Sequence, residues 1–150
     1  MKKVFISILL SAFIALPASA VEGVINVLST FSVEKTAERL DGLLHKKGIT
    51  VFARIQHAKN AAKVGVELRK TELIIFGNPK LGSPLMACQQ SVAIDLPQKA
   101  LIWQDDSDQV WFSYNDPNYL KKRHAIAGCD EALSKIERAL SGLSKAATTD

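Results

Sequence analysis

The sequence predicts an α+β fold in which an antiparallel sheet carries helices on one of its faces. Three observations lead to this class. Short segments with alternating apolar side chains follow one another with tight turns between some of them, which favours antiparallel pairing. Two longer segments, 33–47 and 130–146, repeat apolar residues at helical spacing. The alternation in the strands requires cover on one face only, and these two helices would supply it.

The first half of the chain alternates strands with helices. Residues 24–29 predict a strand, and residues 33–47 predict the first amphipathic helix. Residues 49–57 alternate again, as a strand that ends with His57 in phase with its apolar face. Residues 58–64 predict a short helix.

The middle of the chain combines β-branched runs with turn residues. Residues 72–76 predict a strand that Gly77-Asn78-Pro79 closes. Ser83 suits the N-cap of a helix over 84–90, because proline is favoured at the first helical position. Residues 91–95 predict a further strand.

The last third predicts a hairpin followed by two helices. Residues 100–104 and 110–114 read as strands, and the acidic run 105–108 reads as the polar turn between them. Asp116 and Pro117 start a short helix through about Arg123, and the amphipathic helix over 130–146 completes the domain.

The first 20 residues have the pattern of a cleavable export signal. Lys2 and Lys3 precede an apolar run over 4–16, and Ala18-Ser19-Ala20 fits the small-x-small cleavage rule. The run is shorter than the roughly 20 apolar residues of a membrane-spanning helix, which argues against a permanent membrane anchor. We therefore expect cleavage near Ala20, a periplasmic or secreted protein, and a single domain over residues 21–150.

Charge and composition exclude two classes of protein. Without Lys2 and Lys3, 17 basic side chains stand against 15 acidic ones, which is a net charge of +2. A nucleic-acid-binding protein needs a basic face, so we expect no nucleic-acid partner. The chain is 47% hydrophobic, which excludes intrinsic disorder.

Cys88 and Cys129 are the two cysteines of the chain. In an exported protein they are candidates for a disulfide, which would close a loop of about 40 residues and stabilise the fold by about 3–4 kcal/mol. The alternative is a pair of small buried thiols that do not meet. No Cys-x-x-Cys is present, which argues against a redox centre and against covalent haem attachment.

Five short strings form a set that resembles a known family. They are Thr50–Ala58, Glu72–Pro79, Gly82–Met86, Asp95–Pro97 with Lys99, and Ser113–Pro117. Together they resemble the domain-of-unknown-function 302 (DUF302) family, over roughly residues 24–126. The resemblance implies a curved antiparallel sheet with helices packed on one face, as in the TATA-binding-protein-like group of folds. It implies no established activity, so any cofactor stays unknown.

Few polar residues could form a site, namely His57, Tyr114, His124, Asn78 and Ser83. A histidine can ligate a metal or transfer protons near neutral pH, and a helix start near Asn78 or Ser83 could bind an anion. Each also has a structural interpretation, as a core residue, a helix end or a turn. Catalytic residues and metal ligands therefore cannot be assigned from the sequence.

Three functions follow from these observations. The first is an exported domain that binds a small molecule in a cavity between sheet and helices. The second is a metal- or haem-binding protein, or an enzyme, that uses His57 and His124. The third is a homo-oligomeric interaction protein, with a homodimer formed through a sheet edge. Whether the chain catalyses a reaction stays open.

Overall fold

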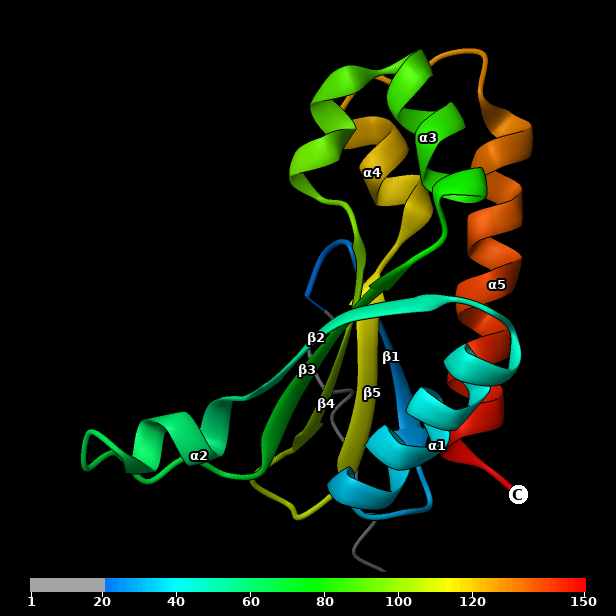
Figure 1. Cartoon of the computed structure of the whole chain (residues 1–150). Helices are drawn as coiled ribbons and strands as arrows, with labels where there is room; N and C mark the ends of the chain where they lie inside the picture. Colours follow the sequence, from blue (N-terminus) through cyan, green and yellow to red (C-terminus); the bar gives the residue numbers. More distant parts are fainter. Residues whose placement is uncertain (1–20) are drawn as a thin grey trace, which may run out of the picture.

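The computed structural model describes residues 21–150, so the expected export signal lies outside the described residues. Figure 1 shows a sheet with two long helices along one side. The strands are β1 (Val24–Ser29), β2 (Thr50–Gln56), β3 (Thr71–Gly77), β4 (Gln98–Gln104) and β5 (Val110–Asn115). The helices are α1 (Val33–Lys46), α2 (His57–Ala62), α3 (Pro79–Cys88), α4 (Pro117–Arg123) and α5 (Asp130–Thr148), with a 3₁₀ helix, η1, at Gln90–Ile94.

The five strands form one sheet in the order β1-β5-β4-β3-β2, and every neighbouring pair is antiparallel. The short turn from β4 to β5 and the longer connection from β2 to β3, which contains α2, each join neighbouring strands directly. The predicted α+β class is thereby confirmed.

One face of the sheet is covered and forms the core. Strand alternation places one set of side chains on this face, where α1 and α5 pack against them. The helices contribute the residues that the apolar spacing identified. The fully buried members of this core include Leu40, Leu44, Ile74, Ala100, Ile102, Phe112, Leu140 and Ala147.

The start of α1 shows how the local sequence sets the element. The Ser32 side chain accepts a hydrogen bond from the Lys35 backbone N–H, which satisfies one free donor of the first turn. Thr36 donates to the Ser32 carbonyl and its hydroxyl lies 2.7 Å from that of Ser29. The end of β1 and the first turn of α1 are thus joined by hydrogen bonds.

Three details of the sequence-based prediction are wrong. Helix α3 begins at Pro79 rather than at Pro84, because Asn78 caps it by accepting from the Lys80 N–H and Pro79 takes the first helical position. Residues 91–95 lie mostly in η1 and not in a strand. His57 opens α2 rather than ending β2.

Candidate functional site

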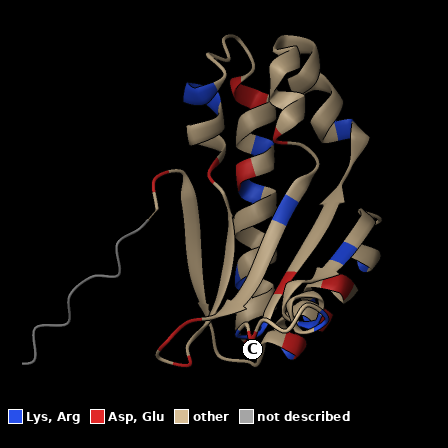
Figure 2. Ribbon diagram, turned by 90° about the vertical axis from the view of Figure 1, so that its left-hand side faces the viewer, with Lys and Arg blue, Asp and Glu red and all other residues tan. Residues whose placement is uncertain are grey.

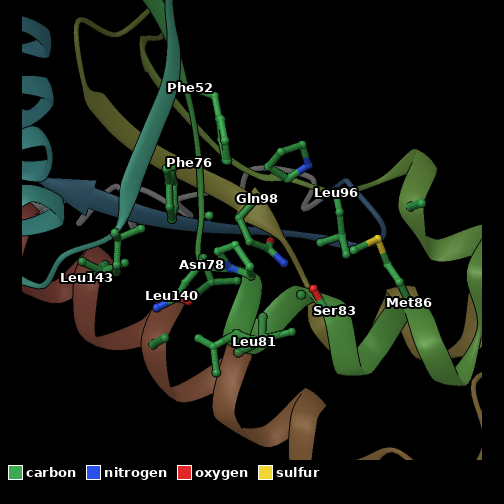
Figure 3. A pocket seen from close by; sticks show the side chains of 18 residues that line it. Phe52, Phe76, Asn78, Leu81, Ser83, Met86, Leu96, Gln98, Leu140 and Leu143 are labelled. Atoms are coloured by element: carbon green, nitrogen blue, oxygen red, sulfur yellow. The ribbon is translucent and has the colours of Figure 1, made fainter.

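A cavity of about 310 Å³ lies at one end of the covered face of the sheet. Its floor is formed by the start of β2, the end of β3 and the start of β4, and its walls by α3, the segment before β4, and α5. Figure 3 shows the lining side chains converging from these elements. The cavity therefore sits between sheet and helices, where ligand pockets of such folds are expected.

The lining is predominantly apolar. Aliphatic, aromatic and thioether groups make up most of the wall, and no charged side chain from residues 21–150 contributes to it. Phe52 is 56% exposed and so belongs to the mouth, whereas Phe76 and Leu140 are buried at the inner wall. The apolar members are Ile49, Phe52, Phe76, Pro79, Leu81, Met86, Ala93, Leu96, Pro97, Ile136, Ala139, Leu140 and Leu143.

Gln98 brings a hydrogen-bonding group into this apolar wall. It pairs with Phe76 across β3 and β4, so its side chain lies on the covered face of the sheet. Its amide nitrogen Nε2 is buried and has no hydrogen-bond partner among residues 21–150. Figure 3 shows the side chain pointing into the cavity. A buried donor without a partner costs about 1–3 kcal/mol, so an acceptor placed in the cavity would be favoured.

Two glycines, Gly77 and Gly82, line the cavity. A Cβ at Gly77 would lie 3.3 Å from Phe52 and 3.5 Å from Pro97, so the small residue permits the close approach of β2 to the segment before β4. A Cβ at Gly82 would lie 3.8 Å from Leu96, which is ordinary contact. A larger side chain at position 82 would therefore extend toward the lining residue Leu96.

Of the five polar residues that the sequence singled out, two line the cavity. Asn78 and Ser83 belong to its wall. The side-chain oxygen Oδ1 of Asn78 already accepts the hydrogen bond that caps α3, and Ser83 is exposed. His57, Tyr114 and His124 do not line it. The sequence-based reasoning missed Gln98, although extending the strand over 100–104 by two residues would have placed Gln98 in phase with Ala100 and Ile102.

The two histidines do not come together. His57 begins α2 and His124 follows α4, and these helices lie at opposite ends of the molecule (Figure 1). Within residues 21–150 no group of three or more His, Cys, Asp or Glu side chains is arranged to hold a metal ion. The geometry thus offers no joint site for the histidine pair.

His124 instead joins α4 to η1. Its Nε2 lies 2.6 Å from an Asp95 carboxylate oxygen, and its Nδ1 lies 3.0 Å from the Ser91 hydroxyl. The His124 side chain is 7% exposed and that of Asp95 is 12% exposed. Arg123 adds a second contact to Asp95 at 3.3 Å. These contacts connect the end of α4 to the segment that leads into β4 and the cavity.

Tyr114 is a core residue. Its ring is 6% exposed and packs edge-on against Phe112, with the ring centroids 6.1 Å apart. Burial raises the pKa of the Tyr114 hydroxyl, while a hydrogen bond with Ser144 opposes the shift. A neutral, buried phenol of this kind stabilises the packing of α5 on the sheet.

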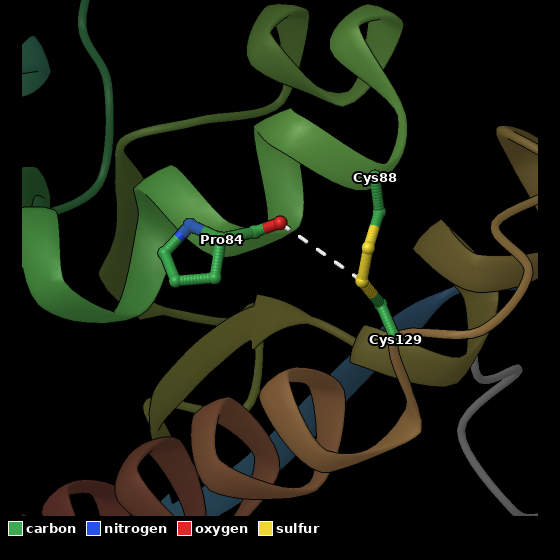
Figure 4. The surroundings of a disulfide bond; sticks show 3 residues. All are labelled: Pro84, Cys88 and Cys129. Carbon is green, nitrogen blue, oxygen red and sulfur yellow. Dashed lines mark hydrogen bonds between the residues drawn. A yellow bond between two sulfur atoms is a disulfide. The ribbon is translucent and has the colours of Figure 1, made fainter.

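Cys88 and Cys129 are joined in a disulfide (Figure 4). Their Cα atoms lie 6.4 Å apart, and the bond links the end of α3 to the residue before α5. Because α3 and α5 form two walls of the cavity, the disulfide holds these walls together at one end.

Curated relatives share this part of the chain within longer proteins. A protein of Brucella suis biovar 1 (strain 1330) named fluoride-specific ion channel FluC 1 is 42% identical over 104 residues, which is 69% of this chain and 41% of that protein. Fluoride-specific ion channel FluC 2 of Brucella melitensis biotype 1 matches at the same identity, over 38% of its length. The chain thus spans about 40% of the length of these relatives. No helix within residues 21–150 is long and apolar enough to cross a membrane.

A solved structure and a family model agree on the fold. The crystal structure of an uncharacterized conserved protein, DUF302, from Bacillus stearothermophilus superposes with a TM-score of 0.75 at 17% identity, covering 85% of this chain and 99% of that one. The family model described as "Domain of unknown function DUF302" matches residues 25–143. The chain therefore belongs to the DUF302 family.

Proposed function

We propose that this domain binds a small, mainly apolar molecule that carries one hydrogen-bond acceptor. The buried and unpartnered Nε2 of Gln98, set in an apolar cavity of about 310 Å³, is the observation that carries the proposal. The apolar wall would supply affinity through burial, and the single donor would orient the ligand.

The cavity volume limits the size of the ligand. A dry cavity of about 150 Å³ accepts one benzene ring, so about 310 Å³ suits a molecule of roughly a dozen non-hydrogen atoms. The uncharged lining disfavours an ion, because a buried charge without a partner is costly. A bicyclic ketone such as 1-tetralone meets both conditions, and tetralin is the same molecule without the acceptor.

Isothermal titration of the purified protein with both probes tests the proposal. We expect 1-tetralone to bind about five- to tenfold more tightly than tetralin, since one hydrogen bond contributes about 1 kcal/mol. In Gln98→Leu the two probes should bind alike. Equal affinities in the unaltered protein, or no binding of either probe, would contradict the proposal.

A glycine pair supplies a matched control. Gly82→Leu should fill the cavity toward Leu96 and abolish binding of 1-tetralone, whereas Gly142→Leu, where no atom lies within 4 Å of the added Cβ, should leave binding unchanged. Both substitutions place leucine in a helix, so both should preserve or raise thermal stability. A shared loss of binding would point to a general effect on the fold and against the cavity as the site.

A further inference from the structure

The face of the sheet opposite α1 and α5 carries large apolar side chains that are half-buried among residues 21–150. Trp103 and Trp111 lie directly opposite each other on β4 and β5, and the neighbouring pair Leu73 and Leu101 continues the patch toward β2. A hollow of about 1250 Å³ lies on this face, and its wall also includes Leu68 of the β2–β3 connection and polar residues such as Arg69 and Asp105. An apolar patch that crosses several strands is typical of an interface.

Hydrogen bonds fix the two indole rings on this open face. Trp103 donates to the Ser113 hydroxyl, which donates to Asn26, and Trp111 donates to the Asp105 carboxylate at 2.7 Å. The indole N–H groups of both rings are therefore satisfied within the chain, and both side chains remain half-buried. Rigid aromatic groups of this kind are the usual anchors of protein–protein contacts.

The connection between β2 and β3 forms an arm, residues 57–70, that stands away from the rest of the molecule on the side opposite α1 and α5 (Figure 1). Helix α2 within it contains no buried residue. Val64, Val66 and Leu68 of the arm are 77%, 54% and 46% exposed. The arm thus presents apolar side chains that the rest of the described chain leaves largely exposed.

Arm and hairpin have complementary charges. Lys59 and Lys63 lie in the part of the arm over 57–66, which has no acidic residue, and neither makes an ion pair within the described chain. The β4–β5 hairpin at 105–108 carries Asp105, Asp106 and Asp108 and no basic residue. Figure 2 shows this acidic loop at the lower edge of the sheet.

The topology places arm and hairpin where a two-fold axis would join them. Both connections lie at the same end of the strands, but the arm leaves the β2–β3 half of the sheet and the hairpin leaves the β4–β5 half. A two-fold axis parallel to the strands and in front of the open face brings the arm of one copy over the hairpin of the other. Because such an interface is isologous, each contact occurs twice.

We propose that two copies of this chain associate through their open sheet faces, each arm packing its valines near the partner's tryptophans and its lysines against the partner's acidic hairpin. The sequence favoured a sheet edge for a homodimer. The face is the better surface, because the half-buried tryptophans lie beside an arm with exposed apolar side chains.

Analytical ultracentrifugation of the protein produced from the full chain tests this interface. We expect a monomer–dimer equilibrium in the micromolar range that Val66→Asp weakens at least tenfold. Ile94→Asp is the control, since Ile94 is 74% exposed but lies in η1, outside the arm and the open face. A monomer at 100 µM, or equal effects of the two substitutions, would overturn the proposal.

A charge exchange tests which surfaces meet. Lys63→Glu and Asp106→Lys should each weaken the dimer, and the two together in one chain should restore it, because the arm and hairpin charges are then reversed as a pair. Lys35→Glu, an exposed position on α1, should have no effect. A dimer that survives every one of these changes would place the contact elsewhere.

Discussion

At the scale of single residues, Ala125 adopts a backbone conformation that alanine rarely takes. It follows the end of α4 with a φ of 49°, in the left-handed region. A left-handed backbone costs an L-residue about 1–2 kcal/mol, and glycine avoids this strain. Part of the gain is offset, because glycine has a larger conformational entropy in the unfolded chain. We predict that Ala125→Gly raises the free energy of unfolding by about 0.5–1 kcal/mol.

Chemical denaturation measures this effect, and two neighbours provide controls. Gly128 has a φ of 75° and open space around its Cβ position, so Gly128→Ala should destabilise by about 1 kcal/mol. Ala127→Gly, whose φ is not positive, should not stabilise. A lower free energy of unfolding in Ala125→Gly would contradict the prediction, because relief of backbone strain at this position would then not stabilise the fold.

Protonation of Asp105 makes the stability of the fold depend on pH in the acid range. The hydrogen bond from the Trp111 indole, and then the backbone N–H groups of Gln109 and Ser107, hold the pKa of Asp105 below its ordinary value. A lowered pKa contributes stability above the unfolded-state pKa, and this contribution is lost as the pH falls through the folded-state pKa. This contribution to stability is therefore lost below about pH 4.

We predict that Asp105→Asn weakens the dependence of the free energy of unfolding on pH in the acid range. The variant should be less stable than the unaltered protein at pH 6, and the difference should shrink at pH 3. Denaturant unfolding followed by tryptophan fluorescence gives both values. Asp106→Asn is the control, since within residues 21–150 the Asp106 carboxylate accepts a hydrogen bond from the Ser107 hydroxyl alone. Parallel profiles for all three proteins would refute the role of Asp105.

At the scale of elements, the disulfide joins α3 to the start of α5 across a sequence separation of 41 residues. Closing a loop of that length stabilises by about 4 kcal/mol in the chain-entropy model. We predict that reduction, or replacement of both cysteines by serine, lowers the free energy of unfolding by about 2–4 kcal/mol. Urea titrations with and without reductant measure it, and an unchanged midpoint would contradict the prediction.

The sequence predicted the strands and long helices well, because alternation and helical spacing are local patterns. β1 and α5 begin where the spacing places them, at Val24 and Asp130. The errors lie where two local signals compete. Both Asn78-Pro79 and Ser83-Pro84 suit a helix start, and α3 begins at the earlier of the two pairs. Pro84 is then tolerated inside the helix.

At the scale of the whole molecule, the cavity could not be predicted in detail from the sequence. Its wall combines residues from β2, β3, α3, β4 and α5, and their convergence depends on how these elements pack. Local turn signals identified Asn78 and Ser83, whereas Gln98 matters because no partner among residues 21–150 reaches its amide nitrogen. His57 and His124 were plausible candidates by residue type, and only the fold shows that they lie far apart.

The central claim is that the apolar cavity around Gln98 binds a small molecule with one acceptor. A ¹H–¹⁵N correlation spectrum recorded during titration with 1-tetralone tests it most directly. The account predicts shifts of the Gln98 side-chain amide and of backbone amides over Phe76–Met86, with the Trp103 and Trp111 indole signals unchanged. Shifts confined to the two indoles, or none at all, would contradict it.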